Sequence, residues 1–470
     1  MAEWTLEQAD LMHWLRAYDG PRFHAVFSDP PYALISIAKR FGKEGSAPAQ
    51  EGSDGRYSRL SGGFMGQRWD GFDSLDHYQA WVTEWANLLI EKALFPGAVA
   101  LFFGGTRTFH RLGTGLELGG FEIIDCLMFL HGQGFPKNHQ IPVEGWEGHG
   151  TSLKPAWEPV FLCRAPRGSK TFAQLAVEHG TGALNIDGAR IAGAVPETSG
   201  QGFHNEKLAG QIGRGDPTMT GEAWSNNAGR WPANLVLSHH PDCQKVGETQ
   251  VKGRTINRFK RGMMPFGNAE GEEYDSEQMP DETVERWACV PECPIRMLDD
   301  QAGSKPSARA SGNPNEPKRG GETVPLWGMS DGEETWDYRD LGGPSRFFYC
   351  SKASRAEKDL GLEDFYWKRT GTGFERITLE EWEKLPKRER ARGCIHPTVK
   401  PLELLRYLAT LVLPPADPEE PRRILVPFSG SGSEVIGAIQ AGWDEAVAVE
   451  MEPIYNDMAE ARIRAAIGML

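Results

Sequence analysis

Residues 423–450 read RILVPFSGSGSEVIGAIQAGWDEAVAVE, which contains two apolar runs on either side of a segment with helical spacing. The runs at 423–427 and 446–450 predict strands, and 433–441 predicts the helix that joins them. A further helix is predicted at 453–467. Strands that alternate with helices are typical of a parallel sheet covered on both faces, so this stretch predicts an α/β fold.

The N-terminal part of the chain shows the same alternation. Its expected elements are a strand at 4–6, a helix at 10–18, a strand at 24–28, a helix at 76–93 and a buried strand at 98–103. Both ends of the chain therefore predict pieces of an α/β sheet.

The middle of the chain differs from both ends. Residues 169–343 are rich in Gly, Pro, Asn and charge, and they contain few periodic runs, which indicates an irregular domain with a functional purpose. After it, an amphipathic helix is predicted at 401–413, ended by two prolines. We therefore divide the chain into 1–168, 169–343 and 344–470.

The composition is that of an ordinary globular protein. The chain has 470 residues, of which 39% are hydrophobic, enough for a core of normal size. The sequence contains no long apolar run of the kind that predicts a membrane span. It also has no basic N-terminal segment of the kind that begins a signal peptide. Seven cysteines spread over this length favour reduced thiols or a metal site over a disulfide framework, which predicts a cytoplasmic protein.

The net charge of -14 opposes nucleic-acid binding as a bulk property, because attraction to phosphate dominates nonspecific affinity. Local basic segments can supply that attraction. Residues 249–267 hold five Lys or Arg residues and no acidic residue, and 384–392 is also mostly basic. Charge pattern alone fits a phosphate contact and a solvated loop equally well.

The sharpest motif is Ser28-Asp29-Pro30-Pro31-Tyr32, which follows an apolar strand and so lies where open α/β sheets bind ligands. Two prolines fix the backbone and remove two N–H donors. This arrangement suits methylation of an exocyclic base amine, a poor nucleophile whose N–H groups would donate to the Asp29 carboxylate and the Pro30 carbonyl. Tyr32 would stack on a base flipped out of the duplex. Taken alone, the motif also fits a rigid turn.

A second motif lies between a predicted strand and a predicted helix. Phe428, Gly430, Ser431 and Gly432 belong to a Phe-Ser-Gly-Ser-Gly loop whose glycines allow the backbone to approach a cofactor. Glu450 ends the next strand, where an acidic group can accept the ribose hydroxyls of an adenosine. A plain strand-to-helix turn and an exposed strand-end charge are the simpler interpretations.

With these motifs in this order, the chain resembles the DNA amino-methyltransferases in which the catalytic Asp-Pro-Pro-Tyr precedes the glycine-rich cofactor motif. Further stretches are similar to segments of that family and of its phage and mobile-element members: 4–10, 102–108, 132–137, 154–159 and 396–401. One departure is Val426, where the glycine motif of the family usually begins with Asp.

The resemblance implies a Rossmann-like, S-adenosylmethionine-dependent methyltransferase sheet completed by both chain ends. Residues 1–168 and 344–470 would form the methyltransferase, and 169–343 an inserted irregular target-recognition domain. The implied catalytic residues are Asp29, Pro30, Pro31 and Tyr32. The implied cofactor-binding residues are Asp10, Asp29, Thr398, Lys400, Phe428, Gly430, Ser431, Gly432 and Glu450.

The implied partner is double-stranded DNA in a bacterial cytoplasm, for a bacterial or a phage-encoded enzyme. The resemblance is also compatible with a homodimer and with a cognate restriction enzyme.

The Asp of the motif favours adenine N6 as the methylated position. Cytosine-N4 enzymes usually have Ser-Pro-Pro-Tyr, and Ser28 stands just before Asp29. The residues are also compatible with a catalytically silent DNA-binding protein, an RNA methyltransferase or a protein glutamine methyltransferase, although the last usually has Asn in place of Asp29. A nicotinamide oxidoreductase would need a longer glycine fingerprint, which this sequence lacks.

A separate pattern joins His239 with Cys243 and Cys289 with Cys293, each pair with the same spacing. Tetrahedral zinc accepts one His and three Cys, so the pattern predicts a structural zinc that would hold together a domain with little core. The same residues also fit ordinary buried thiols. For His396, we expect a role in ordering its loop and none as a general base, because the amine loses its proton only after methyl transfer.

Overall fold

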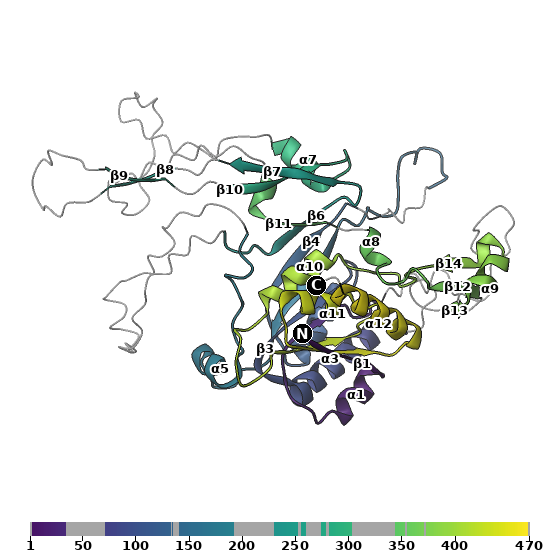
Figure 1. The fold of residues 1–470 in the computed structure, drawn as a ribbon, viewed down its shortest axis with the longest axis horizontal. Helices are drawn as coiled ribbons and strands as arrows, with labels where there is room; N and C mark the ends of the chain where they lie inside the picture. The colour runs from purple at the N-terminus through teal and green to yellow at the C-terminus, as the bar shows by residue number, and fades with distance from the viewer. Residues whose placement is uncertain are drawn as a thin grey trace, which may run out of the picture.

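The computed structural model describes residues 2–33, 71–132, 134, 141–191, 230–251, 255–259, 274–278, 282–302, 344–352, 355–370 and 373–468. A nine-stranded sheet forms its centre (Figure 1). In spatial order its strands are β1 (Glu3–Gln8), β16 (Glu445–Glu450), β15 (Arg423–Pro427), β2 (Phe23–Ser28), β3 (Leu94–Phe103), β5 (Trp157–Arg164), β4 (Glu122–Leu130), β6 (Leu235–His239) and β11 (Tyr349–Lys352). The α/β class expected from the sequence is confirmed.

The first five strands of the sheet are parallel and come from both ends of the chain, with β16 and β15 of the C-terminal part lying between β1 and β2. β1 pairs with β16, so that Trp4 lies opposite Ala446, and β15 pairs with β2 through Ile424 and Ala25. β5 is antiparallel to β3 and β4, and β6 and β11 run parallel to β4. Both chain ends complete one sheet, as expected.

Helices cover both faces of this sheet because its central strands are apolar on both sides. In β2, Phe27 joins one core cluster and Val26 the other, since successive side chains point to opposite faces. One face is covered by α1 (Leu11–Ala17), α3 (Leu75–Leu88) with its π-helical end η3 (Leu89–Ala93), and α4 (Phe109–Leu118). The other is covered by α10 (Leu402–Leu411), α11 (Ser433–Ala441) and α12 (Pro453–Ile467).

The neighbouring strands β15 and β2 mark the switch point of the sheet. After β15 the chain reaches β16 through α11 on one face, whereas α3, which precedes β3, lies on the opposite face. The segments that leave the two strands therefore diverge, and open α/β sheets bind their ligands at this place. The Asp-Pro-Pro-Tyr motif follows β2, and the glycine loop follows β15.

Part of the segment expected to be irregular belongs to the central sheet, because β6 extends it beyond β4. Figure 1 shows α7 (Pro294–Ala302) and the antiparallel ribbon of β7 (Gln244–Val251) and β10 (Glu282–Ala288) near β6. The other elements of this segment are α5 (Phe172–His179), which contacts β3, and a ribbon of β8 (Thr255–Phe259) and β9 (Tyr274–Gln278). The side chains of the basic segment 249–267 lie outside the described residues.

A small sheet precedes α10. Its order is β13 (Gly373–Ile377), β12 (Tyr366–Thr370) and β14 (Arg390–Arg392), and the basic run 384–392 ends in β14. Around it and before it are η5 (Pro344–Phe347), α8 (Arg355–Lys358), α9 (Leu379–Lys384) and η6 (Lys387–Glu389). Trp367 packs with Tyr455 and Met458, which joins this sheet to α12. Within the described residues, no helix combines the length and apolarity needed to span a membrane.

Candidate active site

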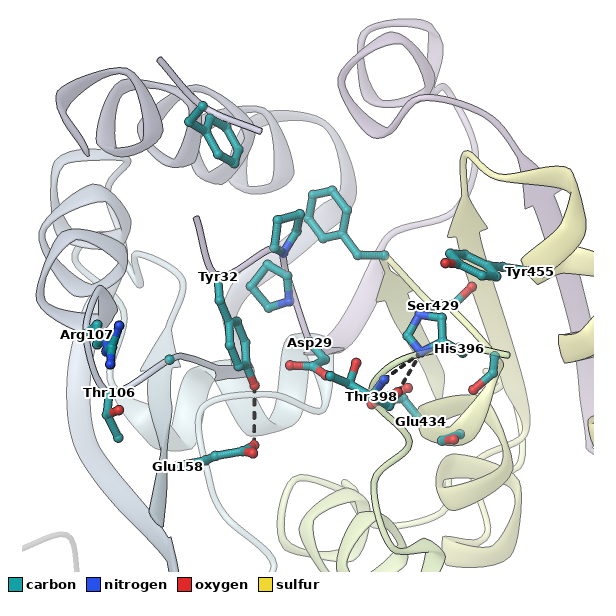
Figure 2. Close-up of a pocket in the computed structure, with 18 of the residues that line it drawn as sticks. Asp29, Tyr32, Thr106, Arg107, Glu158, His396, Thr398, Ser429, Glu434 and Tyr455 are labelled. Carbon is teal, nitrogen blue, oxygen red and sulfur yellow. Dashed lines mark hydrogen bonds between the residues drawn. The ribbon is translucent and has the colours of Figure 1, made fainter. Parts of the chain in front are cut away.

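A cavity of about 1380 Å³ opens at the switch point between β15 and β2. Its walls come from both ends of the chain and include Asp10, Asp29, Tyr32, Gly430 and Glu450. Figure 2 shows Asp29 between Tyr32 on one side and His396, Ser429 and Tyr455 on the other. Two groups of predicted site residues, distant in sequence, therefore share one cavity.

The Asp-Pro-Pro-Tyr segment is held by hydrogen bonds on each side of Asp29. Ser28 Oγ donates to the Pro427 carbonyl oxygen at 2.8 Å, which joins the ends of β2 and β15. The Tyr78 hydroxyl donates to the Pro31 carbonyl oxygen at 2.9 Å, and Thr108 Oγ1 donates to that of Tyr32. The carboxylate is thus presented by a fixed backbone, as catalytic geometry requires.

Lys400 lies behind Asp29 and connects it to a second acid. Its Nζ is 2.9 Å from Asp29 Oδ2, 2.9 Å from Glu158 Oε2 and 3.0 Å from the Tyr32 hydroxyl. The side chains of Lys400 and Asp29 are only 6% and 12% exposed. One buried cation therefore serves two carboxylates and a phenol.

The other oxygen of Asp29, Oδ1, is buried and has no hydrogen-bond partner within the described residues. Leaving a buried acceptor without a donor costs about 1–3 kcal/mol, and more for a charged group, so such groups call for an explanation. Asp29 lines the cavity. A ligand that brings an N–H group there would satisfy Oδ1.

Burial and charge act on these acids in opposite directions. Burial raises the pKa of Asp29 above its ordinary value, while Lys400 acts to lower it. Burial also acts to raise the pKa of Glu158, but there Lys400 and His131 prevail, and the pKa falls below its usual value. Lys400 itself stays charged, because the two carboxylates raise its pKa against the effect of burial.

The glycine loop after β15 has backbone angles in the left-handed region, which glycine adopts readily. Phe428, Gly430 and Gly432 have φ values of 55°, 50° and 76°. A Cβ atom on Gly430 would lie 2.7 Å from His396 Nε2, so only glycine fits there. Glu450 accepts hydrogen bonds from Gly430 N at 2.8 Å and from Glu452 N at 2.9 Å, and burial raises its pKa. Glu450 thus fixes the loop besides facing the cavity.

The predicted site residues fall into two groups. Those that line the cavity are Asp10, Asp29, Pro30, Pro31, Tyr32, Thr398, Phe428, Gly430, Ser431 and Glu450. Lys400 and Gly432 are not among the cavity residues, and the place where a Cβ of Gly432 would stand is filled by Ala459. Val426, the departure from the family pattern, is buried in the core that α10 to α12 cover.

His396 lies beside the glycine loop. Its Nδ1 is 2.6 Å from the Thr398 carbonyl oxygen, and burial lowers its pKa to about 4, which keeps it neutral. Contacts with its own loop agree with an ordering role.

Three charged residues of the site were not assigned a role from the sequence. Glu158 lies in the stretch 154–159, whose likeness to the family gave this residue no role. Glu434 lines the cavity from the first turn of α11, and burial, followed by the charge of Asp29, raises its pKa to about 7. Arg462 is fully buried, and its Nη1 donates to the Ser431 carbonyl oxygen at 2.6 Å and to Ser433 Oγ at 2.8 Å. For Glu434, a charge beside the apolar run 435–439 is the signal that the sequence offered.

The four predicted metal ligands also come together, away from the residues that line the cavity. The ligand atoms of His239, Cys243, Cys289 and Cys293 all lie within 4.8 Å of one another.

Comparisons with known proteins gave one family. The model of the family described as DNA methylase matches residues 23–461. No curated protein matches the chain. Among solved structures, that of the M1.HpyAVI–SAM complex is 11% identical, with 98% of this chain and 99% of that chain covered and a TM-score of 0.33. The PvuII DNA methyltransferase, described as cytosine-N4-specific, is 10% identical, with 98% and 86% covered and a TM-score of 0.36.

Proposed function

Because this chain belongs to the N6/N4 DNA methylase family, we propose that it transfers a methyl group from S-adenosylmethionine to the N6 amine of adenine in double-stranded DNA. The observation that carries the proposal is the carboxylate of Asp29, which lines the cavity and whose Oδ1 is buried with no hydrogen-bond partner among the residues that the structure describes. An exocyclic amine is a donor of the kind that this oxygen lacks.

Asp29 would act on the amine by accepting its N–H in a fixed direction. The hydrogen bond localises the nitrogen lone pair, and alignment of that lone pair with the methyl carbon supplies most of the rate increase. Lys400, 2.9 Å from Asp29 Oδ2, favours the charged carboxylate, because its ammonium group acts to lower the pKa of Asp29 against the effect of burial. After methyl transfer the cationic amine releases its proton readily, so no strong base is required.

Tyr32 would receive the base. The amine is inaccessible inside a duplex, so the base must be flipped into the cavity, where an aromatic face can stack on it. The Tyr32 ring packs against Gly105, where a Cβ atom would lie 3.0 Å from the ring, and its hydroxyl contacts Lys400. The ring is therefore fixed before the base arrives.

The opposite side of the cavity fits an adenosyl cofactor. The Glu450 carboxylate can accept further hydrogen bonds besides those from Gly430 and Glu452, since each oxygen has two lone pairs. Ser429 Oγ is buried without a hydrogen-bond partner within the described residues. Asp10, the N-cap of α1, lines the same side of the cavity. When bound there, S-adenosylmethionine would supply an electrophilic methyl group on its sulfonium.

Cytosine N4 is the second candidate for the methylated position. The Ser28 hydroxyl, which could suggest a Ser-Pro-Pro-Tyr type of site, is buried and donates to the Pro427 carbonyl oxygen. Asp29 is thus the residue that faces the cavity, which favours adenine. The network of Asp29, Lys400, Glu158 and Tyr32 also favours catalysis over a silent DNA-binding role.

We further propose that target recognition belongs to residues 169–343, and that the methyltransferase consists of 1–168 and 344–470. Thr398 and Ser431, as cavity residues, would contact the cofactor. For Lys400 we propose a positioning role toward Asp29. A homodimer, a restriction partner and a cytoplasmic location stay predictions of the resemblance.

The function can be tested with tritiated S-adenosylmethionine and unmethylated duplex DNA made by amplification, long enough to contain many short sites. The DNA is digested to nucleosides, and the labelled nucleoside is identified. We expect label in N6-methyldeoxyadenosine, lost in Asp29→Ala and kept in Asp19→Ala, which alters an exposed carboxylate. Label in N4-methyldeoxycytidine would replace the proposed base, and cofactor binding without label on any DNA would overturn the proposal.

A further inference from the structure

The His239, Cys243, Cys289 and Cys293 side chains form a cluster outside the proposed methyltransferase chemistry, which we call the thiol cluster. His239 Nδ1 is 3.4 Å from Cys289 Sγ and 3.7 Å from Cys293 Sγ. The cysteines are all free thiols. Cys243 and Cys293 are buried.

The spacing of these atoms is that of a tetrahedron around a small metal ion. For zinc bonded to sulfur at about 2.3 Å and to nitrogen at about 2.0 Å, the tetrahedral edges are about 3.8 Å between sulfurs and about 3.5 Å between sulfur and nitrogen. The observed sulfur–nitrogen distances of 3.4 Å and 3.7 Å bracket the second value. The four ligand atoms lie within 4.8 Å of one another, so small side-chain adjustments complete the tetrahedron.

The fold supplies the four ligands from two short turns. His239 ends β6 and Cys243 precedes β7, with Cys243 N donating to the His240 carbonyl oxygen at 2.9 Å. Cys289 follows β10 and Cys293 precedes α7, with Cys293 N donating to the Val290 carbonyl oxygen at 3.1 Å. The antiparallel pairing of β7 with β10 brings the two turns together.

We propose that the thiol cluster binds one Zn²⁺ ion, which attaches the β7–β10 ribbon and α7 to the end of β6. Three thiolates and one imidazole form a closed structural set that leaves no position for a substrate. Among the residues that the structure describes, the buried core here consists of two of the ligands themselves with Leu237 and Ile295, and its other apolar members are only partly buried, which is little buried surface to hold two turns and a helix.

The proposed ion lies near the carboxyl ends of β4 and β6, on the side of the sheet that also carries the candidate active site. In the pairing of β4 with β6, Leu130 is opposite Leu237, and His131, the first residue after β4, lines the cavity. Beyond it, a Cβ atom on Gly132 would lie 2.9 Å from the Pro294 ring, so α7 begins in contact with the end of β4. The ion would therefore fix the ribbon and α7 relative to the active-site edge.

The experiment uses full-length protein purified without a histidine tag and without chelators, because both change metal content. Elemental analysis should find about one zinc per chain, as one Cys₃His site requires. Cys289→Ser and Cys293→Ser should lose the zinc. Cys350→Ala, which removes a thiol packed against the same core but outside the cluster, should keep it.

If the variants fail to fold, a measurement on the unaltered protein still tests the proposal. Thiols are alkylated before and after treatment with a strong chelator, and the labelled peptides are identified. We expect the chelator to expose Cys243, Cys289 and Cys293 while leaving the labelling of Cys126 unchanged. Cobalt in place of zinc should produce the intense visible absorption of a tetrahedral thiolate site.

Three results would overturn the proposal. One is protein that contains no zinc and takes up none when zinc is added. Another is zinc that survives in Cys293→Ser, since the site would then lie elsewhere. The third is a disulfide within the thiol cluster in protein prepared under reducing conditions. None of these depends on methyl transfer, so the failure of this proposal is separable from failure of the proposed function.

Discussion

Lys400 Nζ lies 2.9 Å from Asp29 Oδ2, although the two residues come from opposite ends of the chain. The pair is buried, and Glu158 shares the same ammonium group at 2.9 Å. This contact joins the segment after β2 to the segment before α10 directly behind the reacting carboxylate. It also makes the stability of the fold and the charge of the site depend on one residue.

Replacing Lys400 by Met should lower the free energy of unfolding by about 3–5 kcal/mol, because the buried Asp29 carboxylate and the partly buried Glu158 carboxylate lose their cation. Urea denaturation at neutral pH measures this. Adding Glu158→Gln to Lys400→Met should recover part of the loss, since one uncompensated charge is then removed. Equal stability of the single and double variants would show that the two acids do not share Lys400.

The same substitution should change the pH dependence of methyl transfer. Burial already raises the pKa of Asp29, and Lys400 opposes that rise. Without the cation the pKa of Asp29 rises further. When the pH is lowered, the Asp29 carboxylate is therefore protonated at a higher pH than in the natural protein. The acid limb of the kcat profile should therefore move toward higher pH in Lys400→Met, and a limb at the same pH would contradict this assignment.

Asp29→Asn should reduce kcat by about 10²–10³, because the N–H acceptor aimed at the amine is replaced by a weaker one. The dissociation constant of S-adenosylmethionine, measured by calorimetry, should change much less than kcat, since most of the proposed cofactor contacts are made by other residues of the cavity. Asp19→Asn is the matched control at an exposed position and should leave both quantities unchanged. A parallel loss of cofactor affinity in Asp29→Asn would indicate a collapsed site.

Glu434 should make the stability of the protein fall as the pH rises toward neutrality. Burial raises its pKa from 4.5 to about 7, so the folded state holds a proton that the unfolded state releases. Its contribution is complete below pH 4.5 and is lost as the pH rises through about 7. In Glu434→Gln this loss is absent, so the variant should gain stability relative to the natural protein between these pH values. Parallel stability curves in urea titrations across that range would contradict the prediction.

Arg462→Met should weaken cofactor binding about tenfold or more, because hydrogen bonds to charged groups contribute about 1.5–3 kcal/mol and this residue holds the Ser431 carbonyl. At saturating cofactor, kcat should stay close to its normal value, which distinguishes a positioning residue from a catalytic one. Arg464→Met, one helical step away and exposed, is the control. An unchanged dissociation constant would show that the loop does not need this support.

Gly430→Ala should abolish cofactor binding, because its φ is 50° and the added Cβ would lie 2.7 Å from His396 Nε2. Gly442→Ala has a similar backbone penalty, with a φ of 96°, but its Cβ would meet no atom within 4 Å. The control should therefore lose about 1 kcal/mol of stability and keep its affinity. Equal behaviour of the two variants would remove the special role of Gly430.

Local sequence was enough to predict the elements on which the fold is built. The strands at 24–28 and 423–427 are apolar on both faces, and a residue run of that kind is buried wherever it lies in the sheet. The turn chemistry of Asp29-Pro30-Pro31 and of the loop at Gly430 likewise depends on neighbours in the chain, so their places at strand ends were predictable.

The partners of those residues were decided by the tertiary structure alone. Nothing near Glu158 or Lys400 in the sequence indicates that their side chains meet at Asp29, because the contact exists only after β2, β5 and the segment before α10 are assembled. For the same reason β6 joins the central sheet from within a segment that lacks periodicity. A residue pattern indicates which face of a helix or strand is apolar. The charge that compensates a buried carboxylate is different, because it depends on which distant residue the packing brings within about 3 Å of that carboxylate.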